Sequence, residues 1–332
     1  MAQNHRRSRI FSFRRHRNSR FTLLFRNGWG TRERLVCNLV EIDKALDVDD
    51  LGEHIVGVDH VIRVEPGSRV SDKMWYLMSL CNEVVCFQSD ACDDFFTVNF
   101  FSGQLVKLQN THQVVSESLY ELGCEVGCCP VSGQFKVLFL FRDDTNKTMA
   151  KIQTLGNGEW RSVGNAPVSV LYEDNCFLNG SSHWRGVNCV WSFHFGKEEF
   201  SQIPLPDDII SSAHKKKKQL NAFGTCLCLG IFDSCLCLSG FIESVSVGVH
   251  IWVMKEYGVK ESWVKQIAVV NENIWSAPLV QLDMGKVLVR EGHGLYLYDP
   301  RTKLSKSVKL ERNEPDCCFP TVLASDVKFS WF

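Results

Sequence analysis

The sequence predicts an all-β fold in which antiparallel sheets form a ring of the β-propeller type. Short apolar runs rich in β-branched and aromatic residues recur along the chain, and turns containing Gly, Asn or Asp separate them. No long segment with the 3.6-residue period of an amphipathic helix interrupts this series. With 332 residues, 45% of them hydrophobic, the chain is large enough to bury a sizeable core.

Five segments repeat one design, namely a strand with alternating large residues, a polar turn and a second strand. Gly, Asn and Asp suit such turns because tight hairpins need backbone positions with positive φ. Large aromatic residues follow several turns, where a ring can pack on the next sheet. In chain order the hairpins are 97–108, 131–141, 151–163, 190–203 and 295–308, with turns at 102–103, 132–133, 156–158, 196–198 and 299–301.

The uneven spacing of these hairpins argues against a solenoid but suits a propeller, whose blades are separate four-stranded sheets. At about 40–50 residues per blade, residues 21–332 predict one domain of about six to seven blades. The alternative arrangement is a pair of β-sandwiches. Residues 1–20 contain seven arginines and show no helix or strand period, which indicates a flexible basic tail. Such a tail suits nuclear import, RNA contact or a plain irregular extension.

Charge and composition exclude several classes of partner. The formal net charge of −1 gives no global electrostatic basis for binding nucleic acid, so no nucleic-acid partner is expected. No stretch reaches the roughly 20 apolar residues of a membrane span, and arginines interrupt the N-terminal region where a secretory signal would need an apolar core. The 15 cysteines, an odd number, fit reduced thiols in the cytosol or nucleus better than a disulfide framework.

Two Cys-x-Cys pairs, at Cys226–Cys228 and Cys235–Cys237, invite a zinc interpretation. Zinc sites usually space their ligands Cys-x2–4-Cys, whereas one-residue spacing with Leu between places the thiols on one face of a buried strand. We therefore expect buried thiols without metal or cofactor. The sequence also lacks a nucleophile elbow, a phosphate loop and a dinucleotide fingerprint, so no catalytic residue is expected.

A run of four lysines lies between the apolar segments 190–206 and 225–238. Like charges repel, so this run predicts an exposed, solvated loop. It is either a monopartite nuclear import signal or a plain solvated loop, and no aromatic residues accompany it as a stacking surface for nucleic acid. The residues are Lys215, Lys216, Lys217 and Lys218.

Nine segments, taken in order, resemble the F-box-associated domain of plant F-box proteins. The longest match, VHIWVMKEYGVKESWVK at 249–265, is also the most specific. The others are SLCNEVVCF at 79–87, VNFFSGQL at 98–105, LGCEVGCCPVSGQFKVLFL at 122–140, IQTLGNGEWRSVG at 152–164, CFLNGSSHW at 176–184, VWSFHFGKEEFSQIPLP at 190–206, LGIFDSCLCLS at 229–239 and LYLYDPRTK at 295–303.

This resemblance implies a non-catalytic module that binds a target protein. In the family an F-box binds the Skp adaptor of a Skp–cullin–F-box ubiquitin ligase, whose other subunits carry out ubiquitin transfer. The resemblance does not identify the target. It does assign structural roles to eight motif residues, which are Trp160, Asn179, Gly180, His183, Trp184, Trp252, Tyr257 and Trp263.

The chain departs from the family pattern at three points. Residues 1–60 show no F-box pattern, since they contain no proline and a single tryptophan, Trp29, without the expected context. The F-box is therefore expected to be missing or degenerate and adaptor binding to be doubtful, which leaves a free-standing adaptor or decoy as the alternative function. His194 and Cys129 stand where the family prefers Asp.

Overall fold

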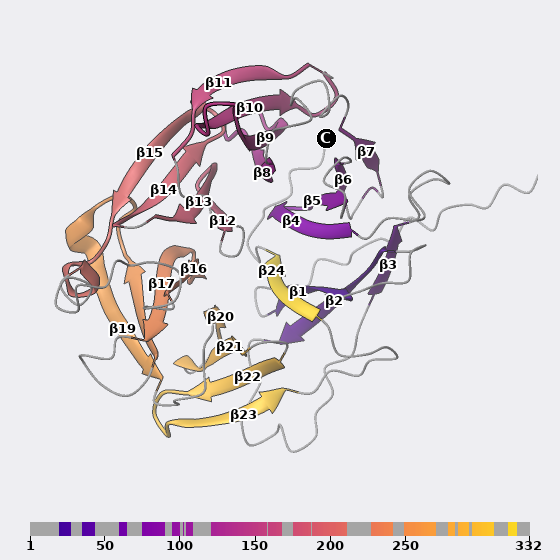
Figure 1. The fold of residues 1–332 in the computed structure, drawn as a ribbon. Helices are drawn as coiled ribbons and strands as arrows, with labels where there is room; N and C mark the ends of the chain where they lie inside the picture. The colour runs from indigo at the N-terminus through magenta and orange to yellow at the C-terminus, as the bar shows by residue number, and fades with distance from the viewer. Residues whose placement is uncertain are drawn as a thin grey trace, which may run out of the picture.

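Antiparallel β-sheet dominates the computed structural model of the chain (Figure 1). Helix within the described part is limited to a single turn at 207–210, the 3-10 helix η1 (Lys260–Ser262) and 3-10 geometry at Gly285. The structure describes residues 20–27, 35–43, 60–64, 75–89, 95–99, 102, 104–108, 121–157, 159–167, 175–186, 188–210, 227–241, 249–269, 278–282, 285–291, 294–308 and 318–323.

The described residues form six four-stranded sheets, which we call blades 1 to 6. Blades 2 to 6 each use four consecutive strands. Blade 2 consists of β4 (Trp75–Cys81), β5 (Val84–Ser89), β6 (Phe95–Asn99) and β7 (Leu105–Lys107), and blade 3 of β8 (Glu121–Cys128), β9 (Phe135–Arg142), β10 (Thr148–Thr154) and β11 (Arg161–Asn165). Blade 4 consists of β12 (Asn175–Leu178), β13 (Ser181–Arg185), β14 (Cys189–His194) and β15 (Glu199–Pro204), and blade 5 of β16 (Leu227–Phe232), β17 (Cys235–Phe241), β18 (Val249–Met254) and β19 (Trp263–Val269). Blade 6 consists of β20 (Pro278–Gln281), β21 (Val287–Glu291), β22 (Gly294–Asp299) and β23 (Leu304–Val308).

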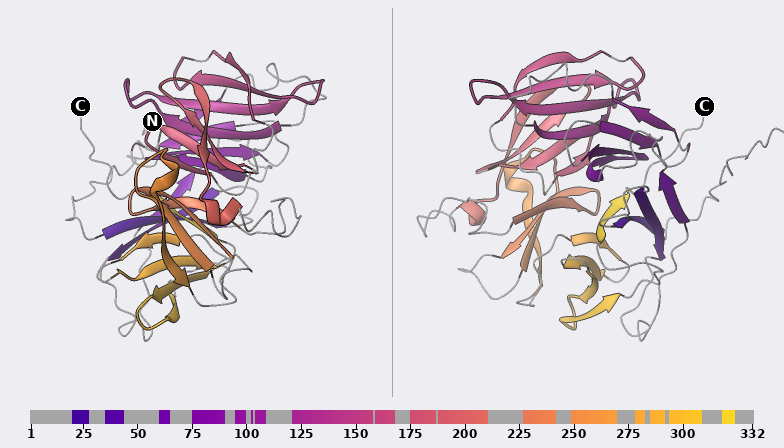
Figure 2. Two further views of the ribbon diagram at one scale, coloured as in Figure 1. Left: turned by 90° about the vertical axis from the view of Figure 1, so that its left-hand side faces the viewer. Right: turned by 45° about the vertical axis from the view of Figure 1, so that its right-hand side comes forward.

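Blade 1 closes the ring with strands from the two ends of the described chain. Its strand order is β24–β1–β2–β3, built from β1 (Arg20–Asn27), β2 (Leu35–Asp43), β3 (His60–Val64) and β24 (Cys318–Leu323). Strand β24 pairs antiparallel with β1, and Figure 2 shows the yellow strand beside the indigo ones. This closed set of sheets confirms the predicted ring and replaces the paired sandwiches. The boundary of the basic tail stays a prediction, because residues 1–19 lie outside the described part.

Two-residue turns join the first and second strands of three blades. In blade 4, Asn179 and Gly180 have φ of 51° and 73°, and in blade 5, Asp233 and Ser234 have φ of 50° and 56°. Positive φ at both central positions is the type I′ turn that matches the twist of paired strands. The Asn-Gly pair of the family motif thus has a direct backbone reason. In blade 2, Asn82 also has positive φ.

Among the described side chains the core lies between the blades, because several central strands are buried and apolar on both faces. On β9, Leu138 and Leu140 pack toward blade 4 while Val137 and Phe139 pack toward blade 2. Side chains of a strand point alternately to opposite faces, so one strand serves two interfaces. Similar buried clusters join blade 4 to blade 5 and blade 5 to blade 6. The structure is thus a ring of sheets that each depend on two neighbours.

Gly127 on β8 supplies a stringent test of this packing. A Cβ added there would lie 2.1 Å from the Phe195 ring of blade 4. We expect Gly127→Ala to reduce the free energy of unfolding by about 3 kcal/mol through overpacking. Urea denaturation of the full chain measures it. Gly133→Ala is the control, since Gly133 has φ of 69° but open space around it, and should cost only about 1 kcal/mol. Equal losses would contradict the packing argument.

Candidate contact site at the turns of blades 3 and 4

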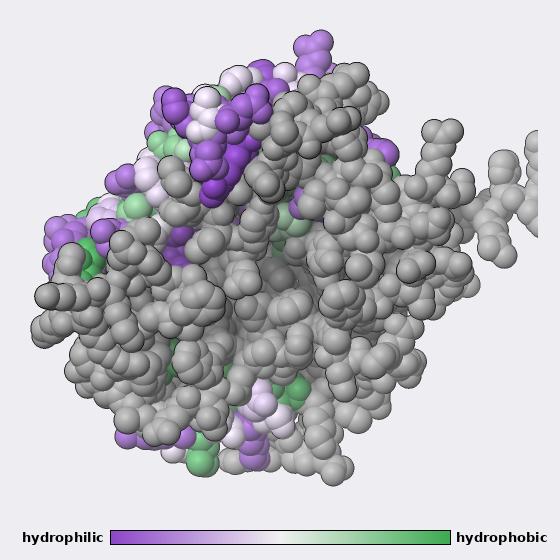
Figure 3. Space-filling model, viewed as in Figure 1, coloured by the Kyte–Doolittle hydropathy of each residue, from purple (hydrophilic) through white to green (hydrophobic). Residues whose placement is uncertain are grey.

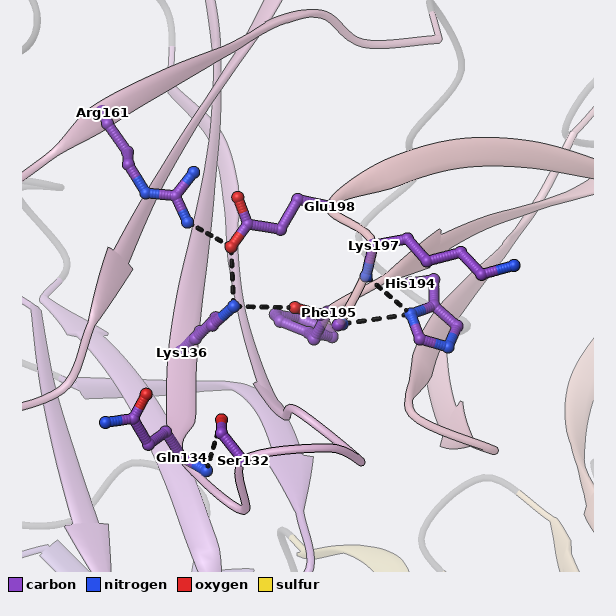
Figure 4. A network of polar contacts seen from close by, with 9 residues as sticks. Ser132, Gln134, Lys136, Arg161, His194, Phe195, Lys197 and Glu198 are labelled. Atoms are coloured by element: carbon purple, nitrogen blue, oxygen red, sulfur yellow. Dashed lines mark hydrogen bonds and ion pairs between the residues drawn. The ribbon is translucent and has the colours of Figure 1, made fainter.

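An ion network ties the β14–β15 turn of blade 4 to the strands of blade 3 (Figure 4). The Lys136 ammonium on β9 donates to Glu198 Oε1 at 2.6 Å and to the Phe195 carbonyl oxygen at 3.0 Å, and Arg161 on β11 donates to the same Glu198 oxygen. Burial alone would raise the pKa of Glu198, but hydrogen bonds from Arg161 and Lys136 outweigh it and lower that pKa. Lys136 is only 8% exposed, so its ammonium holds the β14–β15 turn from the buried side of that turn.

The neighbouring β8–β9 turn of blade 3 interlocks with blade 4 by shape. The Pro130 ring packs against the backbone of Gly180 and Gly196, in space that a side chain there would need. A Cβ added at Gly180 would lie 2.8 Å from the Pro130 ring, and one added at Gly196 would lie 3.3 Å from it. In return, the Phe195 ring covers Gly127 on β8. The two turns therefore hold each other in place. We call segments 129–134 and 194–199 the turn pair.

His194 replaces the usual Asp without loss of the turn. Its Nδ1 accepts hydrogen bonds from the backbone N–H groups of Gly196 and Lys197, both at 3.0 Å. Asp299 Oδ1 accepts from the Arg301 N–H at 2.9 Å in the equivalent turn of blade 6. Backbone N–H groups only donate, so Nδ1 carries no proton in this arrangement. The departure from the family pattern keeps an acceptor at the required place.

Cys129 is the second replacement and follows the same rule. Hydrogen bonds from the Ser132 side chain and from the backbone N–H groups of Ser132 and Val131 lower the pKa of the Cys129 thiol. The sulfur thus occupies the acceptor position of an Asp side chain in this turn. Both residues that replace the usual Asp, His194 and Cys129, therefore belong to the turn pair.

The turn pair presents a small rigid surface to solvent. Val131 at the tip of the blade 3 turn is 89% exposed, and Lys197 in the blade 4 turn is exposed as well. Figure 3 shows a mainly hydrophilic described surface over β10, β11 and β15, with small separate hydrophobic areas. A protruding apolar side chain on a fixed turn loses little conformational entropy when a partner covers it. This makes the turn pair the candidate contact site.

The motif residues His183 and Trp184 point from β13 to opposite neighbours. Trp184 Nε1 donates to Glu125 Oε1 of blade 3 at 3.2 Å. His183 donates from Nδ1 to the Cys176 carbonyl oxygen at 3.2 Å, so its Nε2 accepts from the Tyr257 hydroxyl of blade 5 at 2.7 Å. Burial lowers the pKa of His183 to about 4, which keeps the ring neutral. Strand β13 therefore joins three blades.

The remaining motif tryptophans also lie at blade interfaces. Trp263 Nε1 donates to the Pro204 carbonyl oxygen of blade 4 at 2.9 Å. Trp252 is buried in the cluster between blades 4 and 5. Trp160 packs on Phe139, with ring centroids 5.9 Å apart, in the cluster between blades 2 and 3. With Asn179 and Gly180 in their turn, the motif residues build the scaffold. Two of the eight are exposed, Asn179 at the tip of its turn and Tyr257, whose exposed fraction is 40%.

Other predicted features lie partly or wholly outside the described residues. Lys215–Lys218 fall in the undescribed segment 211–226, so the import signal stays a prediction. Of the two Cys-x-Cys pairs, Cys237 is buried, Cys228 and Cys235 are half-buried, and Cys226 is not described. Within the described ranges, no group of three or more His, Cys, Asp or Glu residues could hold a metal ion. A search of the same ranges found no helix long and apolar enough to cross a membrane.

Removal of the turn acceptor gives a direct test of the role of His194. We expect His194→Ala to cost about 1 kcal/mol in the free energy of unfolding, because two turn N–H groups lose their acceptor. The free energy of unfolding of His194→Asp should stay within about 0.5 kcal/mol of the parent value, since the carboxylate restores an acceptor for the two N–H groups. Thermal and urea unfolding measure both, with Asp299→Ala as the matched loss in blade 6. An equal cost for the Ala and Asp variants of His194 would refute the acceptor role.

The buried His183 predicts a loss of stability on acidification. Its pKa is about 4 in the folded chain and about 6.5 when unfolded, so the unfolded state takes up the proton first as pH falls. The contribution of the neutral His183 to the free energy of unfolding is complete above pH 6.5 and falls by about 3 kcal/mol between pH 6.5 and pH 4. His183→Gln should remove this component. The measurement is the difference in unfolding free energy between parent and variant across pH 4–7, and a constant difference would contradict the prediction.

Comparison with known proteins identifies two curated relatives in Arabidopsis thaliana. An F-box protein is 33% identical over 203 residues, which are 52% of this chain and 45% of that protein. An F-box/kelch-repeat protein is 22% identical over 243 residues, 70% of this chain and 63% of that protein. The chain thus spans about half to two thirds of the length of these relatives. Among solved structures, a chain of a nidogen/laminin complex aligns with a TM-score of 0.42 at 7% identity, over 92% of this chain and 99% of that one.

The family model described as the F-box associated beta propeller domain matches residues 66–317. The match covers blades 2 to 6 and thus all the motif segments quoted above. It agrees with the closed ring of antiparallel sheets. The chain belongs to the family of F-box-associated β-propeller domains.

Proposed function

We propose that this ring recognises a target protein as the substrate-binding part of a Skp–cullin–F-box ubiquitin ligase. The observation that carries the proposal is the match of residues 66–317 to the F-box-associated propeller family, supported by relatives that are named F-box proteins. In this role the ring is non-catalytic. It holds the target near the ligase subunits that transfer ubiquitin, so its contribution is position rather than chemistry.

The turn pair is the part of the described surface best suited to the contact. The Lys136–Glu198–Arg161 network and the Pro130 interlock hold it in one conformation before any partner binds. A preorganised surface binds with a smaller entropic cost than a mobile one. Val131 supplies an apolar anchor in one turn, and Lys197 supplies an exposed cation in the other turn of the pair. A target that places an apolar side chain near an acidic one would complement this surface.

The second candidate function is a free-standing adaptor or decoy that binds the same targets without ligase attachment. The family match covers the propeller at residues 66–317, so it supports target binding in both functions and leaves ligase attachment to the adaptor-binding experiment. The two functions share target binding and differ in adaptor binding, so one pair of experiments separates them.

Target recognition is tested by affinity capture with the full chain and two charge variants. We expect the Leu304→Glu variant to capture the same proteins as the parent chain. The Val131→Glu/Lys197→Glu double variant should capture at least about tenfold less of each target protein. Leu304 is the matched control because it is 61% exposed beside the corresponding turn of blade 6. Quantitative mass spectrometry reads out the capture. Capture that is identical for all three chains would exclude the turn pair as the contact.

Ligase attachment is tested by pull-down with the purified Skp adaptor. For the 332-residue chain we expect binding weaker than about 1 μM, since a complex of that strength needs about −8 kcal/mol and the arginine-rich N-terminal region offers no apolar face. Robust 1:1 binding that is abolished by deletion of residues 1–20 would instead favour the ligase subunit and reveal a degenerate F-box.

A further inference from the structure

A buried carboxyl group lies at the junction of three blades. Glu125 on β8 is 6% exposed, and its Oε1 accepts hydrogen bonds from Asn175 Nδ2 at 2.6 Å and Trp184 Nε1 at 3.2 Å. A further hydrogen bond joins the carboxyl to the Ser182 side chain. These three partners are neutral and come from blade 4. The carboxyl of one blade is thus the common acceptor for the inner strands of the next.

The same contacts reach past blade 3 to blade 2. Asn175 Nδ2 also donates to the Met78 carbonyl oxygen on β4 at 3.0 Å, and Ser79 Oγ on β4 accepts from the Val126 N–H on β8 at 2.7 Å. Blades 2 and 4 are not consecutive in the ring, yet one amide group bonds to both blade 2 and blade 3. We call Met78, Ser79, Glu125, Asn175, Ser182 and Trp184 the Glu125 node.

The charged and titratable groups around the node are directed elsewhere. Lys136, on the same face of blade 3, has its ammonium bound to Glu198 and the Phe195 carbonyl. The thiols of Cys81 and Cys124 lie in the cluster on the opposite face of β8, toward blade 2. His183 on β13 points to blade 5. Among the described residues, the partners of the Glu125 carboxyl are therefore neutral hydrogen-bond donors rather than cations.

Burial without a cation favours the neutral carboxyl. It raises the pKa of Glu125 to about 8, although the hydrogen bonds from Trp184, Asn175 and Ser182 act in the opposite direction. At neutral pH the group is then mostly a carboxylic acid inside the folded chain. In the unfolded chain it ionises at its ordinary pKa of about 4.5. Folding is therefore linked to retention of one proton at this node.

We propose that the Glu125 node is a proton-dependent latch: the neutral carboxyl holds blades 2, 3 and 4 together, and loss of its proton loosens their junction. In the step itself the carboxyl O–H bond breaks, its electron pair stays on the oxygen, and the proton goes to water. A buried carboxylate then remains among neutral donors. The charge weakens this junction first, because the hydrogen bonds of the Glu125 node join blades 2, 3 and 4.

The direction with pH follows from the two protonation states. Stability from this group is complete below pH 4.5 and decreases as pH rises, by about tenfold in the folding equilibrium constant per pH unit, until about pH 8. Glu125→Gln keeps the shape and the Oε1 acceptor but does not ionise. Relative to this variant, we expect the parent folding constant to fall about tenfold per unit between pH 6 and 8 and then to level off.

Urea unfolding of the full chain between pH 5.5 and 9 makes the comparison. Glu198→Gln is the matched control, because it removes a carboxylate at the interface of the same blades 3 and 4. The pKa of Glu198 is lowered, so the change of the folding equilibrium constant with pH between pH 6 and 8 should stay as in the parent. Parallel pH profiles of the parent and Glu125→Gln overturn the proposal.

Two further measurements keep the latch testable if Glu125→Gln fails to fold. Infrared spectra of the folded parent should show a protonated buried carboxyl at pH 7 that is lost near pH 8, whereas a carboxyl already ionised at pH 6 overturns the proposal. Hydrogen exchange, compared with exchange in the unfolded chain at each pH, should show protection lost above pH 8 in residues 123–128 and 175–185. A uniform loss over all blades overturns the idea of a local junction.

Discussion

Packing between neighbouring blades is the constraint on which the rest of this structure depends. A four-stranded sheet of short strands has two faces, and the described blades 3, 4 and 5 bury apolar residues on both, so none of these blades can bury its surface alone. Strand β17 illustrates the arrangement, because Leu236 and Leu238 pack toward blade 4 while Cys237 packs toward blade 6. The Leu and Cys residues of this segment alternate because each set serves a different interface. A ring is the form in which every blade finds two partners.

The motif residues that carry the family resemblance acquire a physical meaning from this constraint. They are mostly not surface residues that meet a partner. Trp184 and His183 join β13 to blades 3 and 5, and Trp263 joins blade 5 to blade 4. Gly180 leaves room for Pro130 of the preceding blade. A sequence pattern built from such contacts identifies the scaffold reliably, whereas target specificity resides in exposed residues that the pattern does not contain.

The sequence alone predicted the architecture well, because hairpins are local. The turns at 132–133, 196–198 and 299–301 follow from Gly, Asp and similar residues a few positions apart. The Glu125 node could not be predicted in this way, since Asn175 lies 50 residues from Glu125 and 97 from Met78. Glu125 stands between Cys124 and Val126 in the middle of a strand, which signals that a partner must exist, but only the ring brings that partner close. The ion network at Glu198 escaped prediction for the same reason.

The order of strands in blade 1 has a consequence for how the protein is made. Strand β24 pairs with β1, so nearly three hundred residues must leave the ribosome before the sheet begun by β1 to β3 is complete. Until then β1 offers an unpaired edge, which is a template for unwanted strand addition. Chain synthesis at 5–20 residues per second leaves that edge open for on the order of ten seconds or more. Completion of this one sheet therefore depends on keeping that edge unpaired until the last strand has been made.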